Sequence, residues 1–378
     1  MSAEIHIGIV AGEASGDLLG ASLIRRLREH FPQLRISGVG GDSMISEGME
    51  SLYEIERLSV MGFVEPLKRL PELLKMRRKL VRHFCRAKVD VFIGIDSPDF
   101  NLGIAKRLHG EGLKTVQYVS PSVWAWRQGR VKGIRKSIDL MLTLFPFESQ
   151  FYEREGVPVK FVGHPLASDI SQAPDKESAS ESLGLVPSKQ RVALLPGSRL
   201  GEIEMMWPVF AETIERLVAL KPELEFIVPA ANKPIYDILA EKVGPGIQLL
   251  LGQARSAVSA SDAVLLASGT STLEVMLLNR PMVVAYRLGQ TTYQIARHLV
   301  RTPFISIPNL LAGKALVPEY IQKDAKPKAL ASSLIELLDD ADVANQQLQA
   351  FQALKAQLER DSSVQAARAI SDLLHSRG

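Results

Sequence analysis

The sequence has little of what marks a secreted, membrane-spanning or nucleic-acid-binding protein. Its 378 residues include one cysteine, which excludes an internal disulfide framework and indicates a reducing compartment. No apolar run approaches the ~20 residues that span a bilayer, and the first apolar stretch, residues 5–10, lacks the charged leader of a signal peptide. The net charge of +3 gives no strong basic field. We therefore expect a soluble cytoplasmic protein without a nucleic-acid partner.

Common nucleotide and metal motifs are also missing. Gly12 and Gly16 lie four residues apart in the first glycine loop, which does not match the dinucleotide fingerprint G-x-G-x-x-G. No G-x-x-x-x-G-K-[ST] occurs, which disfavours a P-loop ATPase. A D-x-D stretch at Asp340 and Asp342 lies in an acidic helical segment and is expected to be solvated. We predict neither a bound metal nor another cofactor.

Apolar runs alternate with helix-length segments, which is typical of parallel sheets covered by helices on both faces. A Ser-, Pro- and charge-rich stretch near residue 165 interrupts the alternation, which then resumes and ends in an Ala-, Leu- and Gln-rich tail. We predict an α/β fold of two Rossmann-like lobes, 1–167 and 168–343, whose parallel sheets face a central cleft. A helical tail, 344–378, packs back on the first lobe or is exchanged in a dimer. The predicted strands are 5–10, 35–39, 89–95, 115–119, 140–144, 159–162, 192–195, 225–228, 247–251, 263–266 and 281–285.

The loop AGEASGD joins the first predicted strand to a helix and carries an acid in its middle. Ligands of such folds sit at the carboxyl ends of the strands, so this loop is expected to face the cleft. Its N–H groups at Gly12, Ser15 and Gly16 would contact a ligand, and Glu13 would bind a sugar or act as an acid or base. The alternative is an ordinary turn in which Ser15 caps the following helix.

A second loop, LLPGSRLGE, follows the strand at 192–195. Gly197 and Ser198 stand before a predicted helix, where free N–H groups and the helix dipole favour an anion. Arg199 adds a planar donor fork suited to phosphate, so the loop is predicted to stabilise a departing diphosphate. The alternative is a solvent-facing arginine on a tight turn.

A third loop, ASGTSTLE, connects the strand at 263–266 to the next helix. The hydroxyl and N–H groups of Gly269, Thr270 and Ser271 are predicted to hold a pyrophosphate. Glu274, one turn into the helix, can accept hydrogen bonds from two ribose hydroxyls. The alternative is a capping box, because Ser271 and Glu274 have the S-x-x-E spacing.

The stretch GIDSPDFN places acids at the carboxyl end of a buried strand. Asp96 comes directly after the strand and is our candidate general base, because a carboxylate in a half-dry cleft can take a proton from an attacking alcohol. Asp99 is expected to cap the helix or hold the loop, and Asn101 can cap the next helix. The alternative for Asp96 is an N-cap aspartate.

Residues 60–84 combine apolar and basic side chains, and the prolines at positions 66 and 71 are expected to break the first part into short turns. A buried amphipathic helix explains residues 72–84. It explains 63–71 poorly, because the apolar residues there fall on several sides. We therefore predict an interfacial patch whose apolar side chains enter the acyl boundary while Lys and Arg meet anionic headgroups. The patch residues are Val64, Leu67, Leu70, Leu73 and Leu74.

Taken in order, several stretches resemble the lipid-A-disaccharide synthase family over nearly the whole chain. They are AGEASGD, VMGFVE, GIDSPDFN, YVSPSVWAWR, LLPGSR, LLASGTSTLE, PMVVAY and IPNLLAG. The resemblance implies a metal-free GT-B glycosyltransferase of lipid A synthesis, peripherally bound at the cytoplasmic face of a Gram-negative inner membrane. It implies inverting transfer from UDP-2,3-diacylglucosamine to the 6-hydroxyl of 2,3-diacylglucosamine 1-phosphate, giving a β-1,6 disaccharide 1-phosphate and UDP.

The resemblance also implies roles for particular residues. Asp96 matches the family's base, and Glu13, Arg199 and Asn309 match positions that matter for activity. Asn309 also lies in the predicted loop PNLLAG, from which its side-chain amide could reach a ligand. The family forms dimers by exchanging C-terminal segments. Two kinds of alternative remain from the residues. One is another GT-B enzyme that uses UDP-N-acetylglucosamine, an epimerase or a peptidoglycan glycosyltransferase. The other is a non-catalytic nucleotide-sugar sensor with a membrane-binding segment.

Overall fold

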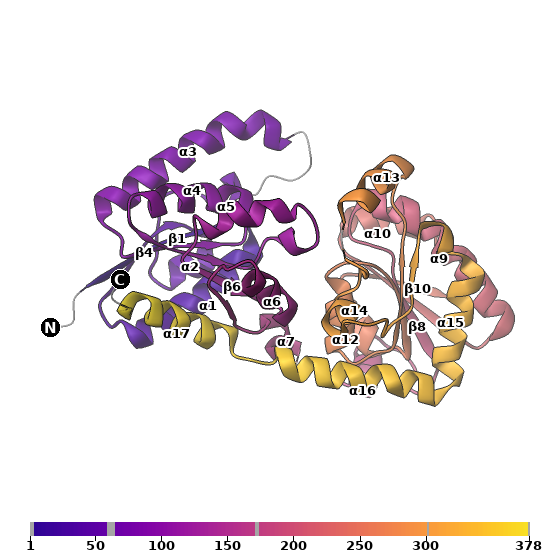
Figure 1. The fold of residues 1–378 in the computed structure, drawn as a ribbon. Coiled ribbons are helices and arrows are strands. Elements are labelled where there is room, and N and C mark those ends of the chain that lie inside the picture. The colour runs from indigo at the N-terminus through magenta and orange to yellow at the C-terminus, as the bar shows by residue number, and fades with distance from the viewer. Residues whose placement is uncertain (1–3, 59–64, 171–173, 301, 377–378) are drawn as a thin grey trace. The chain divides into compact units, whose positions relative to one another are not determined.

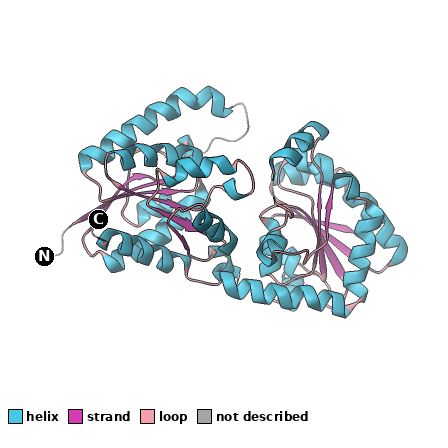
Figure 2. Cartoon of the chain, in the orientation of Figure 1, coloured by secondary structure: helices cyan, strands magenta, loops and turns pink. Residues whose placement is uncertain are grey.

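The computed structural model describes residues 4–58, 65–170, 174–300 and 302–376. The chain divides into two compact units, unit 1 with Met1–Pro165 and Glu359–Gly378, and unit 2 with Leu166–Leu358. Within the described residues each unit is built on one parallel sheet covered by helices (Figure 1, Figure 2). No helix among them is both long and apolar enough to cross a bilayer.

The sheet of unit 1 has the strand order β3-β2-β1-β4-β5-β6-β7 in the described residues. Its strands are β1 Ile5–Ala11, β2 Leu34–Val39, β3 Glu50–Ser51, β4 Val91–Ile95, β5 Lys114–Tyr118, β6 Leu140–Thr143 and β7 Val159–Phe161. β1 and β4 are buried almost throughout because helices cover both faces. The order reverses between β1 and β4, and this reversal is where ligands bind in open α/β sheets.

The helices that follow β1 and β4 cover opposite faces of this sheet. Leu23 of α1 (Ala14–His30) belongs to one apolar core, and Ile104 of α4 (Pro98–Gly110) belongs to the other. This is the topology in which open α/β sheets bind ligands at the carboxyl ends of their strands. The helical elements of unit 1 are α1 Ala14–His30, α2 Asp42–Ser46, η1 Ile55–Arg57, α3 Glu65–Ala87, α4 Pro98–Gly110, η2 Ser122–Trp124, η3 Gln128–Arg130, α5 Val131–Arg135, α6 Pro146–Arg154 and α17 Ser362–His375.

Unit 2 repeats this plan with the described strand order β10-β9-β8-β11-β12-β13 and a reversal between β8 and β11. Its strands are β8 Arg191–Leu195, β9 Glu225–Ala230, β10 Ile247–Leu251, β11 Ala263–Ala267, β12 Met282–Tyr286 and β13 Glu319–Ile321. Its helices are α8 Lys176–Ser182, α9 Leu200–Leu220, α10 Lys233–Ala240, α11 Ala254–Ser259, α12 Ser271–Leu277, α13 Gln290–Leu299, α14 Ile307–Ala312, η5 Gln322–Asp324, α15 Pro327–Asp339 and α16 Ala341–Leu358, with α7 Pro165–Asp169 at the boundary of the units. α9 packs against α15, whereas α12 packs against α14 and α16.

The C-terminal helices are divided differently from the expected tail 344–378. α16 packs on α15 and α12 and belongs to unit 2. α17 packs on α1 of the same chain and belongs to unit 1, where Ala366, Ala367 and Ile370 enter the core. The chain thus returns to the first unit through its last helix.

Two further details differ from the sequence prediction. β3 and β13 were not expected, because two or three partly or fully exposed residues at a sheet edge give no periodic signal. α3 runs unbroken through Pro71 instead of forming short turns. Pro66 lies in its first turn, where a missing N–H is harmless, and Pro71 removes only one hydrogen bond from a 23-residue helix.

Candidate active site

Two turns lie at the strand reversal of unit 1, one after β1 and one after β4. A Cβ atom added to Gly12 would stand 2.0 Å from Ser97 Oγ, and one added to Gly16 would stand 3.8 Å from the Asp96 Cβ. The loop that carries Glu13 therefore touches the turn that carries Asp96. The structure brings these two predicted residues together at one end of the sheet.

The turn at Asp96 has an uncommon backbone. Asp96 has φ +52° and Ser97 has φ +39°, two consecutive left-handed residues that are not glycine. Such a conformation persists only where the surroundings hold it. The Asp96 carbonyl accepts hydrogen bonds from Asn101 Nδ2 at 2.8 Å and Gln117 Nε2 at 3.1 Å, and the Asp96 N–H donates to the Tyr118 carbonyl at 2.9 Å. The half-buried Asp96 is thus mounted on a rigid support.

From the sequence we had expected Asn101 to cap the helix, but it does not. Its side chain is fully buried beneath the turn and donates to the carbonyls of Val10, Ile95 and Asp96. Ser97 occupies the N-cap position of α4. Asp96 comes before that position, so the interpretation of Asp96 as an N-cap is also wrong.

Glu13 has the extended backbone of an N-cap residue at the start of α1, and its side chain makes no capping bond. The alternative in which Ser15 caps this helix is wrong, because α1 already begins at Ala14. Partial burial, and secondarily the Asp96 carboxylate, raise the pKa of Glu13 above its ordinary value. A carboxyl group whose pKa is shifted by burial and by a neighbouring carboxylate is typical of acid–base sites.

A cavity of about 880 Å³ opens beside this loop on unit 1. It is lined by residues of the three segments that follow β1, β2 and β3, among them Ala14, Gly41, Tyr53 and Arg57. Asp17, the second acid of the stretch AGEASGD, also lines the cavity. Its carboxylate accepts hydrogen bonds from the N–H groups of Gly41, Ser43 and Met44 at 2.8, 3.0 and 3.1 Å. Asp17 therefore organises the wall.

Glu148 at the start of α6 is a buried acid that the sequence analysis missed. Its carboxylate accepts from Trp124 Nε1 at 3.1 Å and from the Phe145 N–H at 3.2 Å. Burial raises its pKa to about 7. The ring centroid of Phe145 also lies 5.1 Å from that of His164. Burial lowers the pKa of His164 to about 4. A single Glu at a helix start gives no sequence signal, because its importance comes from the aromatic residues around it.

In unit 2 the strand reversal is bordered by the loops after β8 and β11, where the second and third predicted loops lie. Arg199 is the N-cap of α9, and its side chain is 81% exposed. We had expected free N–H groups in this loop, but those of Ser198 and Arg199 are engaged. They donate to Glu202 Oε2 at 2.9 and 3.3 Å, while Arg199 Nη1 lies 3.1 Å from Glu202 Oε1. An internal carboxylate thus occupies the donors expected to face a phosphate.

The loop after β11 leaves Gly269 and Thr270 exposed. The alternative capping box is not formed: Thr270 is the N-cap of α12 and lacks a side-chain capping bond. Glu274 instead pairs with Arg255 Nε at 2.7 Å, and Ser271 Oγ donates to the Ala267 carbonyl at 3.4 Å. The Arg255 contact fixes the Glu274 carboxylate near the strand end.

The prediction that the Asn309 amide reaches a ligand is wrong. Asn309 lies inside α14, is 1% exposed and has no free amide atom for a ligand. Its Nδ2 donates to the Val317 carbonyl and Glu319, and its Oδ1 accepts from the N–H groups of Leu316 and Val317. We therefore assign Asn309 to the support of the segment that leads into β13.

A cavity of about 1160 Å³ lies at the same edge of unit 2. Its lining is largely apolar and includes Met205, Tyr286, Tyr293, Val300 and Ile305. Met205 lies two helical turns or less from Arg199, and the charges of Glu202 and Arg199 act on the Tyr286 hydroxyl, whose pKa burial raises. An apolar cavity therefore adjoins the arginine loop.

The predicted membrane patch is only partly described. Val64 and the side chain of Leu67 lie outside the described residues. Leu70 is 45% exposed, and Leu73 and Leu74 are half-buried. Among the described residues no group of three or more His, Cys, Asp or Glu side chains is arranged to hold a metal ion.

Comparisons with known proteins extend over the whole chain. A family model described as Lipid-A-disaccharide synthetase matches residues 7–372. A lipid-A-disaccharide synthase from Pseudomonas paraeruginosa is 51% identical, with 100% of each chain covered. One from Azotobacter vinelandii is 52% identical, with 99% of each chain covered.

Solved structures share the two-sheet fold at low identity. A putative UDP-N-acetylglucosamine 2-epimerase from Listeria monocytogenes has a TM-score of 0.65 and 11% identity, covering 100% of this chain and 98% of that one. The calicheamicin glycosyltransferase CalG4 has a TM-score of 0.59 and 12% identity, covering 98% of each chain. At these identities the likeness shows the fold alone.

Proposed function

The chain belongs to the lipid-A-disaccharide synthase family, and from that premise we propose the full reaction that it catalyses. As a glycosyltransferase of GT-B fold, it transfers 2,3-diacylglucosamine from UDP-2,3-diacylglucosamine to the 6-hydroxyl of 2,3-diacylglucosamine 1-phosphate. The products are the β-1,6-linked disaccharide 1-phosphate and UDP. The family match favours this reaction over the epimerase and peptidoglycan alternatives.

One observation carries the proposal: the proposed chemical groups border the strand-order reversal of each sheet. Glu13 and Asp96 follow β1 and β4, and Arg199 and Glu274 stand after β8 and β11. Strand reversals in open parallel sheets are where ligands bind. Unit 1 thus offers carboxylates for an acceptor hydroxyl, and unit 2 offers a cation for a nucleotide diphosphate.

Asp96 acts as the general base in this proposal. Its carboxylate takes the proton of the acceptor 6-hydroxyl while the hydroxyl oxygen forms a bond to the anomeric carbon from the face opposite UDP. The bond from that carbon to the UDP oxygen breaks, and its electron pair leaves with UDP. Base catalysis of this kind contributes typically ~10²–10⁴-fold. The left-handed turn held by Asn101 and Gln117 supports this role, because it fixes the backbone from which the Asp96 carboxylate projects.

Arg199 stabilises the charge that develops on the departing UDP. Its exposed guanidinium can engage two phosphate oxygens at once. Glu202 holds the N–H groups of Ser198 and Arg199 in the free protein, so a bound diphosphate must displace that carboxylate to use them. Glu274, oriented by Arg255, accepts the ribose hydroxyls.

The acylated part of the substrates accounts for the apolar surfaces. The cavity lined by Met205, Tyr286 and Val300 suits acyl chains of the donor, because it adjoins the arginine loop. The patch on α3, with Leu70 exposed, suits contact with the inner-membrane surface, where the acylated substrates reside. Exchange of the segment that ends in α17 would form the homodimer.

A direct assay tests the reaction. The full-length protein is incubated with UDP-2,3-diacylglucosamine and 2,3-diacylglucosamine 1-phosphate in detergent micelles containing EDTA, and the lipids are examined by mass spectrometry and NMR. We expect stoichiometric UDP and a β-1,6 disaccharide 1-phosphate. Conversion of UDP-N-acetylglucosamine without any acceptor would instead identify an epimerase, and a requirement for added Mg²⁺ would contradict the role given to Arg199.

A further inference from the structure

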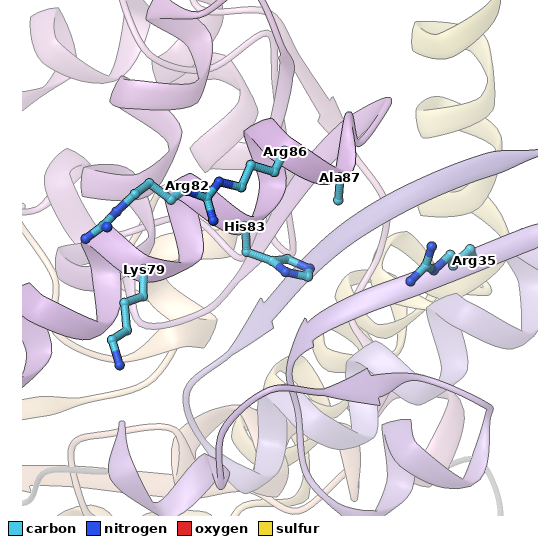
Figure 3. Close-up of a pocket in the computed structure, with 6 residues that line it drawn as sticks. All are labelled: Arg35, Lys79, Arg82, His83, Arg86 and Ala87. Carbon is cyan, nitrogen blue, oxygen red and sulfur yellow. The ribbon is translucent and has the colours of Figure 1, made fainter.

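A basic pocket of about 440 Å³ lies on unit 1, and Figure 3 shows the residues that line it. It is lined by Arg35, Lys79, Arg82, His83, Arg86 and Ala87. Arg35 stands near the start of β2, and the other residues come from the last turns of α3, just before β4. The pocket therefore lies at the amino edge of the parallel sheet, roughly 17 Å from the Asp96 edge for a five-residue strand.

The pocket gathers four cations, and no carboxylate lines it. Within the part of the chain that the structure describes, no hydrogen bond or ion pair engages the side chains of Lys79, Arg82 or Arg86. Arg35 meets Glu50 at 3.5 Å, and both side chains are more than half exposed, so this pair is weak. Like charges held together on two rigid elements repel, and a bound anion relieves that repulsion.

His83 is set to join them as a donor. The Ala87 carbonyl, which can only accept, lies 3.4 Å from His6 Nδ1 and assigns the proton of neutral His6 to that atom. His6 Nε2 then accepts from the buried Ser37 hydroxyl at 3.0 Å, and the Ser37 oxygen accepts from His83 Nε2 at 3.0 Å. His83 Nδ1 is thus left for protonation and for donation to a ligand.

The surroundings of His83 oppose that protonation as long as no anion is present. Burial lowers its pKa, the nearby Glu50 carboxylate raises it, and the Arg35 cation lowers it again. A bound anion adds the missing negative charge, so anion binding and proton uptake at His83 favour each other.

From this geometry we propose that the pocket is a binding site for the phosphate group of a mono- or diester, separate from the site of glycosyl transfer. Arginine forks bind phosphate oxygens two at a time, and the pocket combines forks from α3 and from β2. The exposed cations at positions 75, 79, 82 and 86 also form one stripe along α3. A phospholipid headgroup and a soluble phosphate ester are the two sources of such a group.

Two charge-removing double variants of the full-length protein test the site. Arg82→Gln/Arg86→Gln removes two of the pocket's four cations, and Lys75→Gln/Arg78→Gln removes two exposed cations of the same helix that do not line it. Binding is measured with vesicles of phosphatidylcholine and phosphatidylglycerol, and separately with glycerol 3-phosphate, followed by the NMR signals of the His83 ring. Thermal unfolding shows that each variant is folded.

Diffuse attraction to headgroups is lost by about fivefold for each basic residue, so it affects both pairs alike. We expect the pocket pair to lose at least ~10-fold more vesicle affinity than the control pair if the source is lipid. For a soluble source we expect glycerol 3-phosphate to shift His83 in the wild type and the control pair but not in the pocket pair. Equal vesicle losses together with an unmoved His83 signal would overturn the proposal.

Discussion

Replacing Gly12 with alanine tests how closely the two turns of unit 1 depend on one another. The new Cβ would stand 2.0 Å from Ser97 Oγ and 2.7 Å from Ser97 Cβ. Ordinary contacts between carbon atoms need about 3.5–4.0 Å, so the Asp96–Ser97 turn or the Glu13 loop must move by roughly 1 Å. Misplacement of that size can reduce a rate about 10²-fold. We therefore expect kcat for disaccharide formation to fall by about two orders of magnitude.

The assay separates this effect from misfolding. UDP binding, measured by calorimetry, is expected to stay near the wild-type value because the proposed UDP loops belong to unit 2. Gly133→Ala is the matched control, since its Cβ would have no atom within 4 Å. Adding Ser97→Gly to Gly12→Ala removes both clashing atoms and should restore most of the activity. Wild-type turnover in Gly12→Ala itself would refute the reasoning.

Three further predictions concern single carboxyl groups. Burial raises the pKa of Glu148 from 4.5 to about 7, so the folded protein favours its neutral form. The free energy of unfolding should therefore fall by roughly 3 kcal/mol as pH rises from 4.5 to 7. In Glu148→Gln, that part of a pH profile of stability, measured with a denaturant, should be flat. Glu202→Gln keeps a capping oxygen but removes a charge beside the proposed diphosphate site, so UDP should bind about 3- to 10-fold more tightly by calorimetry, while Glu212→Gln on the exposed side of α9 should change nothing. Asp96→Asn removes a charge that raises the pKa of Glu13, so an NMR titration of the Glu13 carboxyl should give a lower pKa in that variant than in the wild type.

The strand pattern was readable because buried parallel strands are nearly continuous apolar runs. Each predicted strand overlaps an observed one, and Asp96 and Arg199 were predicted as site residues because they directly follow or lie just beyond such runs. The two reversals of strand order could not be predicted from the sequence, because they depend on which strands pair. They are what bring the β1 and β4 loops together.

The failures have a common physical cause, which is that a polar side chain's role depends on distant partners. Asn309 reads as a free loop amide, yet Glu319 and the backbone near Val317 use all of its hydrogen-bonding groups. Asn101 reads as a helix cap, yet it supports the left-handed turn from below. Glu202 accepts a hydrogen bond from the backbone N–H of the N-cap residue, as in a capping box. Because that N-cap residue is Arg199 and not a serine or threonine, the usual sequence signature does not reveal the contact.

The central claim is that the Asp96 carboxylate accepts the proton of the attacking hydroxyl, and the kinetics of Asp96→Asn test it most directly. The account predicts that kcat for disaccharide formation falls by at least ~10²-fold while the calorimetric affinity for UDP stays within twofold of the wild-type value. Turnover at the wild-type rate in Asp96→Asn, with UDP bound normally, would contradict it.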